Sequence, residues 1–143
     1  MRRPQKVVAY IVRDERLLVF VHADDQRFDQ SGLQVPAGTV RDGELPQDAV
    51  LREAVEETGL ADLRVVRYLG AGEYDVRPYA DEVQVRHYFQ LTTDADTVPQ
   101  RWTSIERGDG TGEPIRFELY WLALTQAHAV SAGQAAFIGR LVD

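Results

Sequence analysis

The segment from Gly38 to Leu60, GTVRDGELPQDAVLREAVEETGL, constrains the fold of this chain more than any other. Gly43 and Pro46 mark the start of a helix, and Gly59 lies just past its end. The intervening residues include no helix breaker, and most are fair helix formers. We therefore predict a loop followed by a helix that runs from about Pro46 to Thr58.

This helix carries a high density of acidic side chains on one side. At about 100° per residue, Glu53, Glu56 and Glu57 fall within an arc of about 100°. The other arc is mainly apolar and is expected to pack on a core; it holds Val50, Leu51, Ala54, Val55 and Thr58. Neighbouring carboxylates repel unless a cation neutralises them, and Arg52 can neutralise only part of this charge. The pattern predicts a divalent-metal site, which implies a phosphate-bearing substrate.

The same residues resemble the Nudix box, G-x5-E-x7-R-E-U-x-E-E-x-G-U, in which U is an aliphatic residue. The match covers all seven fixed identities, at Gly38, Glu44, Arg52, Glu53, Glu56, Glu57 and Gly59. Leu60 matches the final aliphatic position, whereas Ala54 is smaller than the usual residue at the first one. With each residue type at about 7% of composition, a chance match anywhere in the chain is on the order of 10⁻⁶.

The resemblance to Nudix hydrolases implies a fold and an activity. The expected fold is α/β, a mixed β-sheet sandwiched between helices, formed by a single domain over residues 1–143. The expected activity is Mg²⁺-dependent hydrolysis of a nucleoside diphosphate linked to another group, with Mn²⁺ as an alternative ion. By this resemblance the metal ligands are Glu53, Glu56, Glu57 and the backbone carbonyl of Ala37.

The resemblance also implies roles in catalysis. Arg52 is expected to orient carboxylates through a charge-assisted contact, with Glu44 as its partner. Nudix enzymes place the general base either on the box helix or on a later loop, and Glu53 is the first choice here. Three downstream residues remain as alternatives: Glu82, Glu106 and Glu113.

The same fold also carries other functional classes. A non-catalytic nucleotide-binding module or regulator of the same fold remains an alternative, although such modules usually lose box carboxylates. An isoprenoid diphosphate isomerase of this fold needs a catalytic cysteine, and this chain has none. The substrate stays open among nucleoside triphosphates, nucleotide sugars and dinucleoside polyphosphates. Tyr74 and Tyr79 are the better aromatic candidates for stacking on a base.

Composition agrees with one globular enzyme domain. Apolar residues make up 44% of the 143 residues, and no apolar run is long enough to span a membrane. The net charge of −7 opposes non-specific binding to nucleic acid. We expect a soluble cytoplasmic protein whose partner is a small nucleotide derivative, and a homodimer is left open.

The rest of the chain is expected to be rich in strands. Apolar or alternating runs predict strands at 6–12, 16–21, 63–69, 82–91 and 115–124, with the first two joined in a hairpin. Residues 92–114 carry Asp, Thr, Pro and Gly and are expected to be mainly loop. Ser131 is expected to cap a final helix that runs to about Leu141, with a buried stripe at Ala135, Ile138 and Leu141.

Overall fold

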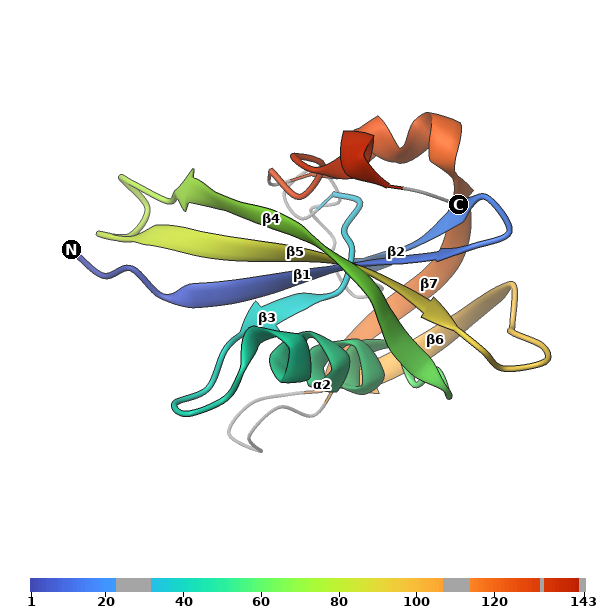
Figure 1. Cartoon of the computed structure of the whole chain (residues 1–143). Helices are drawn as coiled ribbons and strands as arrows, with labels where there is room; N and C mark the ends of the chain where they lie inside the picture. Colours follow the sequence, from blue (N-terminus) through green and yellow to red (C-terminus); the bar gives the residue numbers. More distant parts are fainter. Residues whose placement is uncertain (23–31, 107–113, 132, 142–143) are drawn as a thin grey trace.

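A mixed β-sheet forms the body of the molecule (Figure 1). The computed structural model describes residues 1–22, 32–106, 114–131 and 133–141. Within these residues the sheet has seven strands in the order β4-β5-β1-β2-β7-β6, with β3 beside β1. The strands are β1 (Gln5–Arg13), β2 (Arg16–His22), β3 (Ala37–Thr39), β4 (Leu63–Asp75), β5 (Val83–Thr93), β6 (Arg101–Glu106) and β7 (Ile115–Ala123). Among these strands, β1 and β5 pair in parallel and the other pairs are antiparallel.

Helical segments cover both faces of this sheet, which confirms the predicted α/β architecture. Helix α2 (Pro46–Thr58) lies on one face. The other face carries two short 3-10 helices, Leu124–Ala129 and Ile138–Arg140, on the opposite side of the ribbon from α2 (Figure 1). No helix among the described residues is long and apolar enough to cross a membrane.

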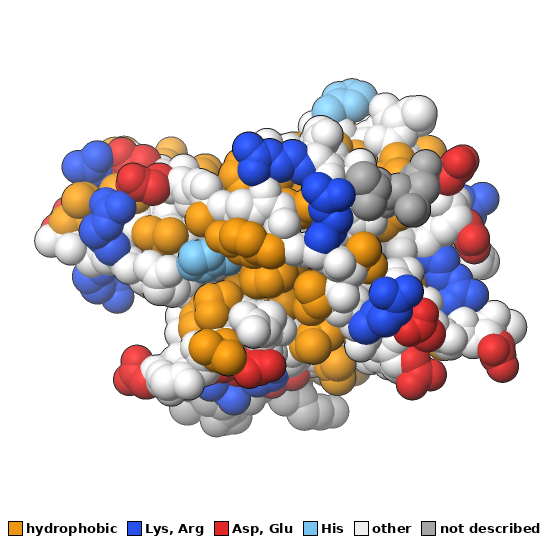
Figure 2. Space-filling view, in the orientation of Figure 1, with side chains coloured by type: hydrophobic (Ala, Val, Ile, Leu, Met, Phe, Trp, Pro, Cys, Tyr) orange, Lys and Arg blue, Asp and Glu red, His pale blue; other side chains and the backbone are white. Residues whose placement is uncertain are grey.

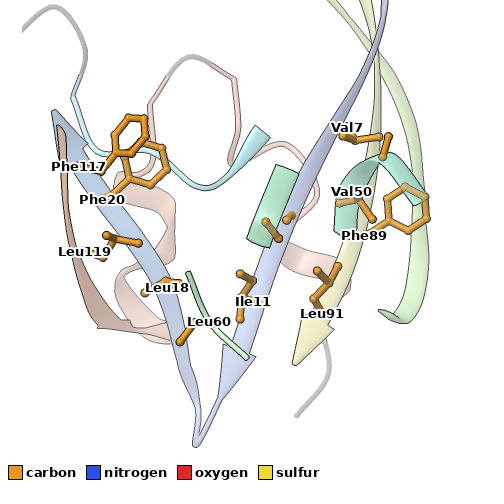
Figure 3. Close-up of a cluster of buried hydrophobic side chains, with 13 residues drawn as sticks. Val7, Ile11, Leu18, Phe20, Val50, Leu60, Phe89, Leu91, Phe117 and Leu119 are labelled. Carbon is orange, nitrogen blue, oxygen red and sulfur yellow. The ribbon is translucent and has the colours of Figure 1, made fainter. Parts of the chain in front are cut away.

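Alternation along the central strand β1 divides the core into two clusters. Val7, Ala9 and Ile11 face α2, whereas Val8, Tyr10 and Val12 face the C-terminal segment. Because both faces are covered, β1 reads as one continuous apolar run rather than as an alternating pattern. Figure 3 shows the α2-side cluster, in which side chains of β1, β2, β5 and β7 converge with those of the helix.

Helix α2 has the predicted bounds, because the signals at its ends are local. Pro46 occupies its first turn, and Gly59 ends it in the left-handed conformation, at φ 71°, with its N–H donating to the carbonyl of Val55. One part of the predicted apolar arc is wrong: the side chain of Val55 is 50% exposed. At 100° per residue the buried stripe centres near Val50 and Ala54, and Val55 lies well outside it.

A C-terminal helix was predicted from Ser131 to Leu141, and the described residues 133–141 do not form it. Gly133 has a positive φ of 74°, which interrupts a right-handed helix at its start. The backbone bonds that follow span three residues rather than four, as from the N–H of Ala136 to the carbonyl of Gly133. The segment therefore consists of turns and the 3-10 helix Ile138–Arg140, although Ala135, Ile138 and Leu141 still pack on the core.

The prediction of loop over residues 92–114 is wrong in part, because β6 lies inside this range. Each residue from Arg101 to Glu106 pairs with β7, from Tyr120 back to Ile115. The strand is held by its partner and carries no apolar alternation of its own, so sequence pattern alone did not reveal it.

A hydrophobic surface lies where α2 meets β4 and β5, and Figure 2 shows it as the orange area at the centre of that view. It surrounds a shallow cavity whose apolar lining is Leu51, Leu63, Val65, Tyr68 and Phe89. This surface faces away from the acidic side of the helix.

Candidate metal centre

An acidic cleft of about 910 Å³ lies between α2, β3 and the end of β6. Pairing with β1 places β3, the signals at Pro46 and Gly59 set the ends of α2, and pairing with β7 places β6. The cleft is lined by Ala37, Gly38, Thr39, Arg41, Arg52, Glu53, Glu56, Glu57, Ile105 and Glu106. It thus gathers the predicted site residues Ala37, Arg52, Glu53, Glu56 and Glu57 into one concave surface.

Arg52 is the centre of the hydrogen-bond network in this cleft. Its Nε and Nη2 donate to the two carboxylate oxygens of Glu44, each at 2.9 Å. Its Nη1 donates to Oε1 of Glu53 at 2.8 Å, and Nη2 also donates to the carbonyl of Thr39 at 2.9 Å. The planar guanidinium therefore ties the helix to the preceding loop and to β3. The expected contact between Arg52 and Glu44 is present.

Glu44 is fixed from two sides. Besides the fork of Arg52, the backbone N–H of Arg41 donates to its Oε1 at 3.0 Å. The hydrogen bonds from Arg52 and then from the Arg41 amide lower the pKa of Glu44 to about 2. Glu44 is absent from the lining of the cleft, so it holds Arg52 from behind.

Gly38 is required by close approach rather than by backbone conformation. A Cβ added there would overlap Cδ and Oε1 of Glu53. The side chain of Glu53 therefore lies directly over the glycine, between β3 and Arg52. This contact explains why the motif joins a glycine in β3 to a glutamate on the helix.

Three carboxylates meet at the mouth of the cleft. Oxygens of Glu53, Glu56 and Glu106 all lie within 4.8 Å of one another. Glu57 stands behind them: its side chain is buried, and its Oε2 accepts the N–H of Ala37 at 3.2 Å. The helical angle explains this difference, because Glu57 projects close to the buried stripe of Val50 and Ala54.

Burial and crowding oppose the charge on these groups. Burial raises the pKa of Glu57 well above its ordinary value, and the charges of Glu53 and Glu106 raise it further. Burial also raises the pKa of Glu53, against the opposing effect of its hydrogen bond with Arg52. The pKa of Glu106 is raised by burial and by the charges of Glu53 and Glu56. The guanidiniums of Arg41 and Arg52 do not offset this concentration of carboxylates.

The donor set fits a hard divalent cation. Mg²⁺ and Mn²⁺ prefer oxygen ligands, and carboxylates that converge within a few ångströms supply them. A cation at this position would offset the repulsion that raises the pKa values of Glu57 and Glu106. Among the described residues, Glu106 is the downstream glutamate that joins the cluster.

The other candidates for the base lie elsewhere. Glu82 is 9% exposed and forms an ion pair with Arg2 at 2.8 Å, so the structure does not bring it to the cleft. Glu113 falls outside the described residues. Glu106 was one of the three downstream candidates for the base. It is selected by its place at the end of β6, which pairing with β7 fixes and which has no signal in the sequence pattern.

The aromatic candidates do not line the cleft either. The ring of Tyr74 is covered by the guanidinium of Arg86, with 3.9 Å from Cζ to the ring centroid. Tyr79 is 94% exposed in the turn after β4. Neither tyrosine therefore reaches the carboxylate cluster from its position in this structure.

Comparisons with known proteins identify the family and the fold. The family model of the NUDIX domain matches residues 2–141. The MutT NUDIX hydrolase from Burkholderia pseudomallei superposes with a TM-score of 0.69 at 19% identity, over 99% of this chain and 100% of that one. The MutT protein from Methanosarcina mazei Go1 gives 0.67 at 18% identity, over 97% and 92%. A UDP-X diphosphatase gives 0.65 at 16% identity, over 98% of this chain and 63% of that one. At these identities the likeness to solved structures shows the fold.

Proposed function

The chain belongs to the NUDIX domain family, and from that premise we propose that it hydrolyses a phosphoric anhydride bond in a nucleoside diphosphate linked to another group. One observation carries the proposal: carboxylate oxygens of Glu53, Glu56 and Glu106 converge within 4.8 Å beside Arg52. A pure binding module has no need for this concentration of carboxylates, whereas cleavage of a charged diphosphate does.

The residues that would hold a divalent cation are Glu53, Glu56 and Glu106 at the mouth of the cleft, with Glu57 and the carbonyl of Ala37 behind them. A bound Mg²⁺ or Mn²⁺ supplies Lewis-acid screening of the phosphate oxygens. Without that screening, a diphosphate would be repelled by the same glutamates. Arg41, whose guanidinium lies 3.9 Å from Glu56, adds positive charge at the rim.

In the proposed reaction the oxygen of a water attacks phosphorus, one P–O anhydride bond breaks, and the departing phosphate takes the bonding pair. Glu53 accepts the proton of that water. Its carboxylate is placed by contact with Gly38 on one side and by Arg52 on the other, so little rearrangement is needed. Arg52 acts as a positioning residue, because its donors are used on Glu44, Glu53 and Thr39.

The substrate within the nucleoside diphosphate class is left to experiment. Among the similar structures, the name UDP-X diphosphatase refers to a nucleotide derivative, which supports a panel that includes nucleotide sugars. We propose a test with a panel of nucleoside triphosphates, nucleotide sugars and dinucleoside polyphosphates. Each compound is incubated with protein and Mg²⁺ or Mn²⁺, and inorganic phosphate and pyrophosphate are measured separately.

The expected result is metal-dependent cleavage of at least one compound, which stops when the metal is removed by a chelator. A Glu56→Gln variant that remains folded should lose most of that activity at a fixed metal concentration. No cleavage of any compound by the folded wild-type protein, with either metal, would count against a hydrolase.

A further inference from the structure

A second cavity, which we call the neutral groove, adjoins the acidic cleft. It has a volume of about 570 Å³ and lies between the C-terminal end of α2 and β6. Its walls come from residues 58–61, at and just past the end of the helix, from Ala95 and residues 97–99, and from residues 102–105 of β6. Figure 1 shows β6 passing beside α2. Ile105 lines both cavities and is 47% exposed, so the groove and the cleft meet at this residue.

The two cavities differ sharply in charge. The acidic cleft is lined by Arg41, Arg52 and four glutamates. The neutral groove has no Asp, Glu, Lys, Arg or His in its lining among the described residues. Its side chains are aliphatic, aromatic or hydroxyl-bearing, as at Leu60, Trp102 and Thr103. The negative end of the α2 dipole also points toward the groove, which disfavours an anionic group there.

Strand β6 links the two cavities along one face. The alternating half-buried residues Trp102, Ser104 and Glu106 point toward α2, because side chains two residues apart share a face. Trp102 lies at the groove end, where its Nε1 donates to the carbonyl of Thr58 at 2.8 Å. Glu106 lies at the cleft end, within the carboxylate cluster. This row spans about 13 Å at the usual rise per strand residue.

The groove also offers backbone hydrogen-bonding groups. Strand β6 is last in the order of the sheet, and within the described residues it pairs only with β7. Thr103, Ser104 and Ile105 are consecutive and all line the groove, although successive side chains point to opposite faces. The groove therefore runs along the open edge of the strand, where N–H and C=O groups are available to a ligand.

We propose that the neutral groove binds the nucleoside part of the substrate, its base and sugar, while the diphosphate lies over the carboxylate cluster of the adjoining cleft. This inference rests on the proposed function, and it assigns recognition of the base and sugar to the neutral groove. An uncharged planar base suits a wall of Leu60 and Trp102 with a strand edge beside it. The diphosphate suits the acidic cleft on the other side of Ile105 once a divalent cation screens its glutamates. The uncharged and charged parts of the substrate thus correspond to the neutral groove and to the metal-binding cleft.

The first test uses nucleosides without phosphate and without metal, so it does not depend on catalysis. Adenosine, guanosine, cytidine and uridine are titrated into the ¹⁵N-labelled protein and followed by NMR. We expect at least one of them to shift the indole N–H of Trp102 and the amides of 103–105. The amide of Tyr79, on the exposed turn after β4, should stay in place. Shifts confined to other regions, or none with any nucleoside at millimolar concentration, would overturn the proposal.

The second test fills the groove. Ala61 is exposed and lies on its wall, so Ala61→Phe should occupy part of the space without disturbing the core. Ala71→Phe is the matched control, on the exposed surface of β4 at the other edge of the sheet. With a substrate found in the panel, we expect KM to rise about tenfold or more for Ala61→Phe, with kcat changed far less. Ala71→Phe should leave both constants near their wild-type values.

The outcomes separate the two proposals. Unchanged KM in a folded Ala61→Phe protein that cleaves its substrate refutes the neutral groove and leaves the hydrolase intact. If the wild-type protein cleaves nothing, the hydrolase proposal fails, and the nucleoside titration still decides whether the groove binds a base. If nucleoside no longer shifts the Trp102 indole N–H in Ala61→Phe but still shifts it in Ala71→Phe, the result supports nucleoside binding in the neutral groove. This NMR measurement does not depend on enzymatic activity.

Discussion

Replacement of Arg52 by lysine tests whether its planar fork organises the site. Arg52 donates to both oxygens of Glu44, to Glu53 and to the carbonyl of Thr39. A lysine ammonium is a single donor group and cannot reach all of these acceptors at once. Loss of one such bond, worth about 1.5–3 kcal/mol when a charged group takes part, predicts a fall of about that size in the free energy of unfolding.

The effect on activity is expected to be larger than stability alone explains. Without the Nη1 contact, the carboxylate of Glu53 is no longer fixed over Gly38. Misplacement of a catalytic group by about 1 Å can cost about 10²-fold in rate, so we expect a fall of that order in kcat. Both quantities are measured on the same preparation, by urea unfolding and by steady-state kinetics at a temperature where the variant is folded.

The chain offers a matched control for this substitution. Arg64 forms an ion pair with Asp94 at 2.7 Å, but both side chains are more than half exposed. Exposed pairs contribute about 0–1 kcal/mol, so Arg64→Lys should change little in either assay. Equal behaviour of Arg52→Lys and Arg64→Lys, with full activity in both, would show that the network around Arg52 has no special role.

Three further predictions concern the same region. Millimolar Mg²⁺ or Mn²⁺ should raise the melting temperature, because metal that binds the folded state stabilises it by about 2.7 kcal/mol when the free metal concentration is one hundred times Kd. An unchanged melting temperature, with no heat of binding in calorimetry, would contradict the metal site. Gly38→Ala should displace the carboxylate of Glu53, so metal affinity should fall more than thermal stability does; calorimetry and a melt on one sample compare the two. Because the pKa of Glu44 is lowered from 4.5 to about 2, its ionised carboxylate stabilises the folded state above pH 4.5, and this stabilisation is lost as pH falls from 4.5 toward 2. The Glu44→Gln variant should therefore lose less stability over this pH range than the wild-type protein does, as measured by acid unfolding.

The local part of the site was predictable because its signals are local. Pro46 and Gly59 set the ends of α2, and the spacing of Glu53 and Glu56 sets their common side. The burial of Glu57 was harder to foresee, although its helical angle places it beside Val50 and Ala54. The sequence showed which glutamates lie on the same side of the helix, but the burial of each side chain depends on which segments pack against the helix.

The remaining part depends on contacts between distant segments. Glu106 enters the cluster because β6 pairs with β7, and β6 itself has no strand pattern in a stretch rich in Asp, Thr and Pro. The neutral groove needs the same strand and the end of α2 together. At the C-terminus, Gly133 adopts a positive φ that stops a helix, which the apolar spacing of Ala135, Ile138 and Leu141 could not reveal.

The most direct measurement of the central claim is the turnover of Glu53→Gln with Mg²⁺ present, on a substrate that the wild-type protein cleaves. The substitution keeps the shape of the side chain and removes its charge and its proton acceptor. Loss of a general base commonly costs about 10²–10⁴-fold, and loss of a metal ligand adds to it. The account predicts a fall in kcat of at least that size with folding retained, and only a small change for Glu82→Gln, whose carboxylate pairs with Arg2. The account would be contradicted if Glu53→Gln kept the turnover of the wild-type protein, or if Glu82→Gln lost its turnover while Glu53→Gln did not.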